Sequence, residues 1–560
     1  MNSDRQIKYD VAIRSVPCPV QFCTQHSMPK LFLLLIVLCG STPAIAEDSR
    51  PNILFYFVDD WGRFANVYAS PETPSLNDLL ETPNFDRIAR EGVRFNNAFV
   101  PVSSCGPCRA SLVTGQYFWN CGSGAFLNGR ASDWKTTPNP FRSMTYFPDL
   151  LRESGYMARR AIKTIHFTAS KPTKAERSLP QQPYRRYGLY VSEAKTEAET
   201  QQRIEETLNH PRYEMRRVLR SSAALDQPFF FVYGTINVHR PFAPDSGEKQ
   251  WGIDPDSLKG LIPRFLPDVH DVRRDFADYL GEVQAADAMF GTMLDELDAA
   301  GQLDNTLIII TGDNGIPGVP RGKTNCYDLS VQAPLMVRWP GKVKAGRTVD
   351  DFVNVMDIGP TLLEASDLEI PKSMDGKSFL RQLLAEESGW INPQRNQVVI
   401  GRELHFHSAR DGNLPYPMRA IRTPEYLYIR NFKTNRWPNG APYNIEDIDS
   451  AGNYDRLAES PYRDLDASLT KAWLLANRDT QQASQSLEQT LGKRPGEELY
   501  RVTDDPDQLD NLADQAEYAE VKSELASRLM TVLRDSKDPR LNDDFDRPPY
   551  VIPPPVTAKQ

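Results

Sequence analysis

Two apolar segments that run directly into polar residues constrain the fold of this chain more than any other feature. Residues 52–58 (NILFYFV) and 307–311 (LIIIT) are apolar apart from their end positions. The polar residues that follow them are Asp59, Asp60, Asp313 and Asn314. Such apolar runs are typical of strands buried on both faces of a parallel sheet. Because ligands of these sheets bind beyond the carboxyl ends of the strands, we expect the polar residues to line a binding site.

Helical patterns alternate with these predicted strands. Thr82 offers an N-cap, Pro83 a first-turn residue and Gly92 a terminator around an apolar stripe. Apolar residues also keep helical spacing over residues 274–301, directly before the second strand. Strands alternating with helices predict a doubly wound α/β fold.

The predicted secondary-structure pattern changes from about residue 397. Shorter strand-like runs (VVIG, YLYIR) precede a helical stretch near 517–534. We expect a catalytic domain over residues 47–395 and a smaller α+β subdomain over 396–540. Residues 541–560 are a proline-rich tail, which from Arg547 onward is predicted to be extended on the surface or disordered.

The N-terminal segment has the three parts of a secretory signal peptide. Met28 and Lys30 precede the apolar run LFLLLIVLCG, and small residues end at Ala46. We expect residues 1–46 to be a leader with the signal at 28–46, translation to begin at Met28, and cleavage to follow Ala46. The apolar run is too short to span a bilayer. The sequence therefore predicts an exported protein without a stable membrane anchor, periplasmic or secreted, or lysosomal in a eukaryote.

Charge and cysteine content exclude two further classes. The net charge of -9 argues against a nucleic-acid partner, because such proteins present a basic face. Removing the leader leaves four cysteines, too few for a disulfide framework in a chain of 560 residues. Pairing of Cys108 with Cys121 stays open.

The most informative segment is SSCGPCRASLVTG, residues 103–115, which resembles the signature of the formylglycine-dependent sulfatases. The resemblance implies that a maturation enzyme oxidises Cys105 to formylglycine, with Pro107 and Arg109 as required neighbours. An aldehyde hydrate offers one hydroxyl to attack sulfur and a second to expel sulfate. A helix beginning at this residue would direct its free N–H groups to the anion.

The acidic pairs match the metal site of the same family in order and context. Their hard oxygen ligands suit Ca²⁺ better than the more exacting Mg²⁺, and no cluster of cysteine and histidine competes for zinc. We expect one Ca²⁺ per chain, held by Asp59, Asp60, Cys105, Asp313 and Asn314.

Four further positions match catalytic residues of the family. Lys163 and His166 fall in AIKTIH, His239 ends the segment PFFFVYGTINVH, and Lys323 lies in RGKTNCY. The resemblance implies that both lysines bind sulfate, that His239 protonates the leaving group and that His166 acts as a base. The pKa of an ordinary histidine suits proton transfer near neutrality. Three substrate contacts are also expected, at Arg240, His405 and His407.

The segment EELYRVTDDPDQLDNLAD, residues 497–514, extends the resemblance across nearly the whole mature chain. It implies the alkaline-phosphatase-like fold, a mixed sheet sandwiched by helices with a smaller C-terminal α+β subdomain.

The expected partner is a sulfated glycan. VPVSSCGPCRASLVTG, TGDNGIP with GKTNCY, and YPMRAIR resemble the heparan N-sulfatases of the family. This predicts N-sulfoglucosamine of heparan-like chains as substrate. The sequence departs from the heparan N-sulfatases in two ways. Lys323 stands where those enzymes are expected to have an arginine, and the spacing of Lys163 and His166 is of the iduronate-2-sulfatase type. An O-sulfatase or arylsulfatase is therefore the alternative.

Two other classes remain open on sequence alone. A phosphoesterase of the same superfamily would present a serine or threonine nucleophile, or several histidines around two metals; the chain has seven histidines in all. A protein that binds sulfated glycans without turning them over would keep the fold but not the oxidised cysteine.

Overall fold

The computed structural model describes residues 50–127, 138–179, 182–445 and 461–551. The predicted leader and signal peptide lie outside these residues, as does the end of the tail from residue 552. The described residues all belong to one compact unit. No helix in the described part of the chain combines the length and apolar character needed to cross a bilayer.

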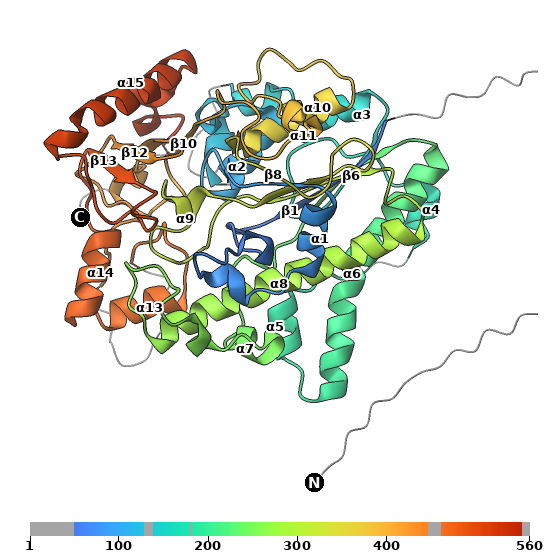
Figure 1. The fold of residues 1–560 in the computed structure, drawn as a ribbon, viewed down its shortest axis with the longest axis horizontal. Coiled ribbons are helices and arrows are strands. Elements are labelled where there is room, and N and C mark those ends of the chain that lie inside the picture. The colour runs from blue at the N-terminus through green and yellow to red at the C-terminus, as the bar shows by residue number, and fades with distance from the viewer. Residues whose placement is uncertain (1–49, 128–137, 180–181, 446–460, 552–560) are drawn as a thin grey trace, which may run out of the picture. The chain divides into compact units, whose positions relative to one another are not determined.

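A seven-stranded mixed sheet is the centre of this unit (Figure 1). The strand order is β4 (Met157–Ile162), β5 (Phe229–Gly234), β1 (Asn52–Val58), β6 (Thr306–Gly312), β7 (Leu335–Arg338), β2 (Val93–Phe95) and β8 (Arg347–Val349). The first four strands are mutually parallel, and β7 pairs antiparallel with both of its neighbours. Both apolar runs of the sequence are therefore central strands, fully buried as predicted.

Helices cover both faces of the sheet (Figure 1). One layer contains α2 (Cys105–Thr114), α3 (Phe147–Glu153), α10 (Ile358–Ala365) and α11 (Leu380–Leu384). The other contains α1 (Pro83–Glu91), α6 (Glu197–Leu225) and α8 (His270–Ala299). Shorter elements are α4 (Lys174–Arg177), α5 (Tyr187–Ser192), α7 (Ser246–Trp251), α9 (Asp328–Val331), β3 (Ala98–Phe99) and β9 (Val353–Asn354).

Alternation along β1 divides the hydrophobic core in two. Ile53, Phe55 and Phe57 belong to the cluster that includes α2 and α10, whereas Leu54 and Tyr56 belong to the cluster that includes α1 and α8. Successive side chains of a strand point to opposite faces, so one apolar strand supplies both cores. The prediction of an α/β fold with a mixed sheet sandwiched by helices is confirmed.

Helix α1 begins differently from the sequence prediction. The Thr82 hydroxyl accepts a hydrogen bond from the Asn66 N–H at 2.9 Å rather than capping the helix. The cap comes instead from Asp287 of α8, whose carboxylate accepts from the N–H groups of Asn84 (3.3 Å) and Phe85 (2.7 Å). A residue 203 positions away therefore satisfies the helix terminus.

The C-terminal subdomain is built on a four-stranded antiparallel sheet in the order β10 (Val398–Arg402), β11 (Met418–Arg422), β12 (Tyr426–Asn431) and β13 (Glu497–Arg501). Its helices are α13 (Leu469–Ala476), α14 (Gln481–Leu491) and α15 (Ala519–Asp535). The domain boundary predicted at residues 395–396 falls between α11 and β10 and stays a prediction.

A buried charge network ties the end of the chain to this sheet. The Arg419 guanidinium donates to Asp538 at 2.6 and 3.0 Å and to Glu403 at 2.8 Å. Arg540 donates to the other oxygen of Glu403 at 2.5 Å. The side chains of Arg419, Glu403 and Asp538 are inaccessible to solvent, so each charge depends on these partners.

Candidate active site

The acidic residues after β1 and β6 meet because the two strands are neighbours in register. Val58 pairs with Gly312, so Asp59 and Asp313 leave the sheet side by side. The Asp60 N–H donates to Asp313 Oδ1 at 2.9 Å. Asp60 adopts a left-handed backbone conformation with φ of 59°, which Asp tolerates better than most residues.

These oxygens form a buried cluster. The amide nitrogen of Asn314 donates to Asp60 Oδ1 and to Asp313 Oδ1, both at 2.8 Å. Those bonds fix the orientation of the amide, and its oxygen Oδ1 is left buried without a partner among the described residues. Buried polar atoms are nearly always satisfied, so an unpaired acceptor beside three carboxylates calls for a bound cation.

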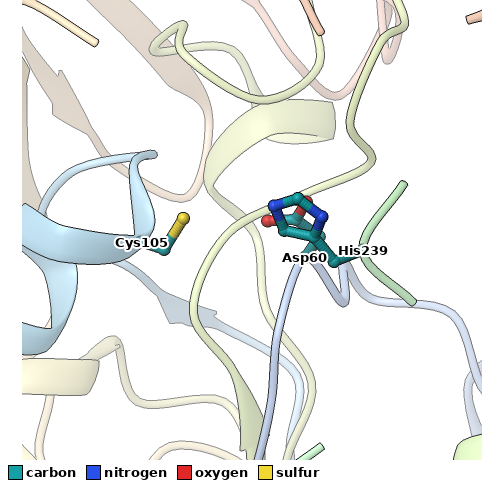
Figure 2. A group of neighbouring side chains, drawn as sticks. All are labelled: Asp60, Cys105 and His239. Atoms are coloured by element: carbon teal, nitrogen blue, oxygen red, sulfur yellow. The ribbon is translucent and has the colours of Figure 1, made fainter. Parts of the chain in front are cut away.

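Cys105 begins α2 beside this cluster. Its sulfur forms two groups with acidic or imidazole atoms, one with Asp60 and His239 and one with Asp59 and Asp313; within each group the atoms lie within 4.8 Å of one another. Figure 2 shows the thiol extending from the helix toward the side where Asp60 and His239 lie. Burial raises the pKa of this thiol to about 11.

Arg109 lies one turn further along α2, on the same side of the helix. Its guanidinium donates to Asp313 Oδ2 at 2.8 Å and to Asp59 Oδ1 at 3.3 Å, and it stacks 4.5 Å from the Phe57 ring. A third bond at 2.9 Å reaches the carbonyl of Lys163. Arg109 therefore joins α2 to the ends of three strands.

Lys163 follows β4 and forms an ion pair of 2.6 Å with Asp59 Oδ2. The turn that carries it packs against Gly234, where a Cβ would lie 1.6 Å from the Lys163 carbonyl oxygen, so only glycine fits there. Although burial raises the pKa of Asp59, the charges of Lys163 and Arg109 hold it well below its usual range. Burial raises the pKa of Asp313 to about 7, against the opposing charge of Arg109.

Lys323 approaches from the loop after β6. Its ammonium lies 2.9 Å from Asp60 and 3.2 Å from Asp466 Oδ2. Burial lowers the pKa of Lys323, but Asp466 and Asp60 raise it well above the ordinary value overall. Asp466 was not predicted from the sequence: it belongs to an irregular segment before α13 and has no motif around it.

His239 faces the cluster from the segment after β5. Its Nε2 lies 3.9 Å from Asp60 Oδ2, and its Nδ1 lies 2.6 Å from the carbonyl of Arg240. The carbonyl can only accept, so Nδ1 carries the proton in the neutral ring and Nε2 is free toward the cluster. The side chain is about one-third exposed, at 35%, which leaves it accessible to a ligand.

The other predicted residues lie further out. His405 is buried, and its Nδ1 lies 2.8 Å from the hydroxyl of Ser104, the residue before Cys105. Arg240 is held in a bidentate ion pair with Asp275 at 2.6 and 2.9 Å.

The side chains of His166 and His407 are exposed, and the His166 ring packs edge-on against Phe141. Their predicted roles stay predictions.

The other cysteines of the described residues, Cys108, Cys121 and Cys326, are buried thiols. All four in the described residues are free and buried, so Cys108 and Cys121 are unpaired in this structure. Burial raises the pKa of both thiols, which suits structural cysteines.

The residues around the cluster fit a hard divalent cation. Three carboxylates and one unpaired amide oxygen converge, and all four side chains are buried. Oxygen ligands of this kind hold Ca²⁺ or Mg²⁺ in preference to zinc.

Comparison with known proteins settles the class. The family model Sulfatase matches residues 51–368, more than half of the chain, and a second model, N-sulphoglucosamine sulphohydrolase, C-terminal, matches residues 322–441. The chain belongs to the sulfatase family, and it is a sulfatase rather than a phosphoesterase.

Curated relatives agree with this assignment. An ulvan-active sulfatase of Formosa agariphila is 25% identical over 87% of this chain and 76% of its own length. The human N-sulphoglucosamine sulphohydrolase is 28% identical over 74% of this chain and 77% of its own length.

Solved structures show the same fold. A 2-O GAG sulfatase superposes with a TM-score of 0.54 at 17% identity, covering 90% of this chain and 98% of its own. A sulfatase from Pseudoalteromonas sp. gives 0.51 at 19% identity, covering 87% and 91%.

Proposed function

We propose that this sulfatase hydrolyses the N-sulfate of glucosamine at the non-reducing end of heparan-like chains. The observation that carries the proposal is the match of residues 322–441 to the C-terminal model of N-sulphoglucosamine sulphohydrolase. That region contains both Lys323 of the buried cluster and His405, which contacts the residue before Cys105. The relationship to the human enzyme of that name, at 28% identity, supports it.

We propose formylglycine, made from Cys105 by a maturation enzyme, as the nucleophile. A thiol with a pKa of about 11 is protonated at neutral pH and is a poor nucleophile. As a hydrated aldehyde, residue 105 supplies one hydroxyl to attack sulfur and a second to expel sulfate. Its position at the first residue of α2 places it at the positive end of the helix, where an anion is stabilised.

The side chains around Cys105 have distinct roles in this proposal. Arg109 holds Asp59 and Asp313 in place from α2, and Lys163 and Lys323 bind the sulfate oxygens and stabilise the charge that develops on them. His239 donates the proton to the leaving amine from Nε2 when both ring nitrogens are protonated, and it becomes the neutral ring with its proton on Nδ1; its Nε2 faces the cluster and the side chain is accessible. His166 is the candidate base for the second half of the reaction; its side chain is exposed and its ring packs against Phe141.

We propose Ca²⁺ as the cation, held by Asp59, Asp60, Asp313, Asn314 and residue 105. Asn314 Oδ1 is the ligand with no other role, because it has no partner in the described structure. Bound there, the ion supplies positive charge against the oxygens of the sulfate. Export through the segment at 28–46 is also proposed; a sulfated glycan outside the cell is the substrate that this localisation supplies.

An O-sulfatase of the iduronate-2-sulfatase type is the second candidate. Two sequence features favour it, the Lys163 to His166 spacing and the lysine at position 323. Relatives also include sulfatases named for other substrates, such as the ulvan-active enzyme. Substrate choice is made by loops around a shared core, so the fold supports both candidates equally.

The deciding experiment compares kcat/KM for N-sulfated glucosamine with that for 2-O- and 6-O-sulfated sugars and a simple aryl sulfate. We expect the highest value for the N-sulfate. A higher value for any O-sulfate would overturn the N-sulfatase proposal and leave the sulfatase class intact. Peptide mass spectrometry of residue 105 in active protein should show an aldehyde, and Cys105→Ala should fold normally without turnover.

A further inference from the structure

A cavity apart from the acidic cluster lies between loops of the large mixed sheet and segments of the small C-terminal sheet. Its volume is about 370 Å³, and residues from the loop after β1, from the segment around α9, and from the turn after β13 line it. Neither Cys105 nor any of the acidic residues of the active-site cluster lines it. It is therefore a separate site, although Arg321 in its wall precedes Lys323 by two residues.

The charged residues of this wall are unevenly paired. Arg63, Arg321 and Arg422 face Asp328 and Asp507. Both aspartates are already engaged: Asp328 pairs with Arg422 at 2.9 Å, and Asp507 pairs at 2.8 Å with Arg264, which lies outside the wall. Two positive charges are left without a carboxylate.

Arg321 is one of these two. It is buried, and its guanidinium donates only to backbone carbonyls, those of Gln489 at 3.1 Å, Asp507 at 3.3 Å and Gln508. It stacks 4.6 Å from the Tyr327 ring. Its Nε is buried and has no acceptor among the described residues. The charge itself is not neutralised by any of these contacts.

Arg63 is the second. Its guanidinium stacks 4.6 Å from the Tyr68 ring. The Nε atom of Arg63 is buried without an acceptor. The Arg63 side chain forms no ion pair with any of the described residues. Burial lowers the pKa of this guanidinium, and the nearby charges of Arg94 and Arg422 act in the same direction.

Gln508 adds a third unpaired donor. Its side chain is buried, and Oε1 accepts from the Asp328 N–H at 3.0 Å. That bond fixes the orientation of the amide, so the group left buried without a partner is the donor Nε2. All three orphaned groups around the cavity are donors, and two of them belong to uncompensated cations.

We propose that this cavity is an anion site that binds a sulfate group, presented either as free sulfate or on a sulfated saccharide. Sulfate is doubly charged and accepts hydrogen bonds without donating any, which complements a wall in which two arginines have no carboxylate partner. A sulfatase also works where sulfate and sulfated chains are both present. The inference concerns a site apart from Cys105 and does not depend on which sulfate bond the enzyme cleaves.

The test compares thermal unfolding of the full-length protein with two variants of the cavity. Arg63→Gln removes an uncompensated charge, and Gln508→Glu introduces an anion beside the two arginines. Both should unfold at a higher temperature than the wild type in sulfate-free buffer, because each relieves the unpaired charge. Arg430→Gln is the matched control, since Arg430 also stacks over an aromatic ring, 5.3 Å from Phe432, but does not line the cavity.

Two probes are then added separately, sodium sulfate against sodium chloride of equal ionic strength, and a heparin hexasaccharide. We expect a saturable rise in the unfolding temperature of wild type and Arg430→Gln that is at least halved in both cavity variants. A rise with inorganic sulfate identifies the free ion, and a rise with the hexasaccharide alone identifies the chain. kcat/KM on an aryl sulfate should stay unchanged in Arg63→Gln. Equal rises in all four proteins with both probes would overturn the proposal.

Discussion

The hydroxyl of Ser104 lies 2.8 Å from Nδ1 of His405, a contact between residues 301 positions apart in the sequence. Ser104 is the N-cap residue of α2, directly before Cys105, and His405 belongs to the C-terminal subdomain. The subdomain therefore fixes the backbone at Cys105, the proposed precursor of the nucleophile. Burial, and then the charge of Lys323, lowers the pKa of His405 to about 4.

This contact predicts a pH-dependent stability. The folded-state pKa of His405 is below the unfolded value of about 6.5, so the unfolded chain binds more protons between these values. The contribution of neutral His405 is complete above pH 6.5 and is lost as the pH falls toward 4, by up to about 3 kcal/mol. His405→Asn keeps a polar partner for Ser104 and cannot titrate. Denaturant unfolding at pH 4.5 and 7.5 should show a smaller difference for this variant; an equal difference would contradict the burial of a neutral ring.

Removing a cation ligand should abolish both metal content and activity. In Asp313→Ala the cluster loses a carboxylate and Arg109 loses a partner at 2.8 Å. We expect elemental analysis to give one calcium per wild-type chain and none in the variant, and kcat to fall by at least about a hundredfold. Prolonged chelation should reproduce the loss and added calcium should reverse it. Two zinc ions per chain, or full activity after chelation, would refute the assignment.

Asp466 should matter to catalysis although no motif marks it. Its carboxylate lies 3.2 Å from the Lys323 ammonium, so Asp466→Asn removes a counter-charge that positions this lysine. We expect kcat/KM to fall about tenfold, the effect of roughly 1.4 kcal/mol, with the unfolding temperature nearly unchanged. Asp479→Asn, at an exposed position near α13, is the control. Unchanged kinetics on the N-sulfated and aryl substrates would show that Asp60 alone positions Lys323.

Asp287→Ala should destabilise the fold without touching the site. The carboxylate accepts from the N–H groups that begin α1 and from the Asn84 side chain at 2.8 Å; the two N–H groups lose this partner, and the Asn84 side chain keeps only its bond to the Asp287 carbonyl at 3.2 Å. The free energy of unfolding should fall by about 2 kcal/mol. Asp295→Ala, on the exposed face of the same helix, should change it by less than about 0.5 kcal/mol. Similar values for the two variants would show that α1 does not need this cap.

The sequence predicted those parts of the molecule in which local pattern and sheet geometry agree. The two apolar strands and the acidic residues that follow them indicate the fold class, because neighbouring parallel strands bring Asp59 and Asp313 together at one edge of the sheet. The reversed strand β7 and the capping of α1 by Asp287 depend on tertiary contacts that have no local signal.

The same distinction applies to the site. Cys105, Arg109 and Lys323 stand in recognisable motifs, and the structure places them in contact distance of the acidic cluster. Asp466 belongs to an irregular segment that has no helical or strand-like hydrophobic pattern. Its proximity to Lys323 depends on how the subdomain packs. His405 was expected to contact the substrate, but its buried position against Ser104 could not be deduced from its neighbours in the sequence.

The charge network at the end of the chain limits how far the protein can be shortened. Arg419 lies in the middle of the small sheet, yet its counter-charge Asp538 comes from the last described segment. Deleting residues from 538 onward would leave Arg419 buried beside Glu403 alone and would remove Arg540 from Glu403, at a cost of roughly 3 to 5 kcal/mol. A shortened enzyme made for crystallisation or for polysaccharide processing therefore has to keep the chain at least through Asp546, which also pairs with Arg540.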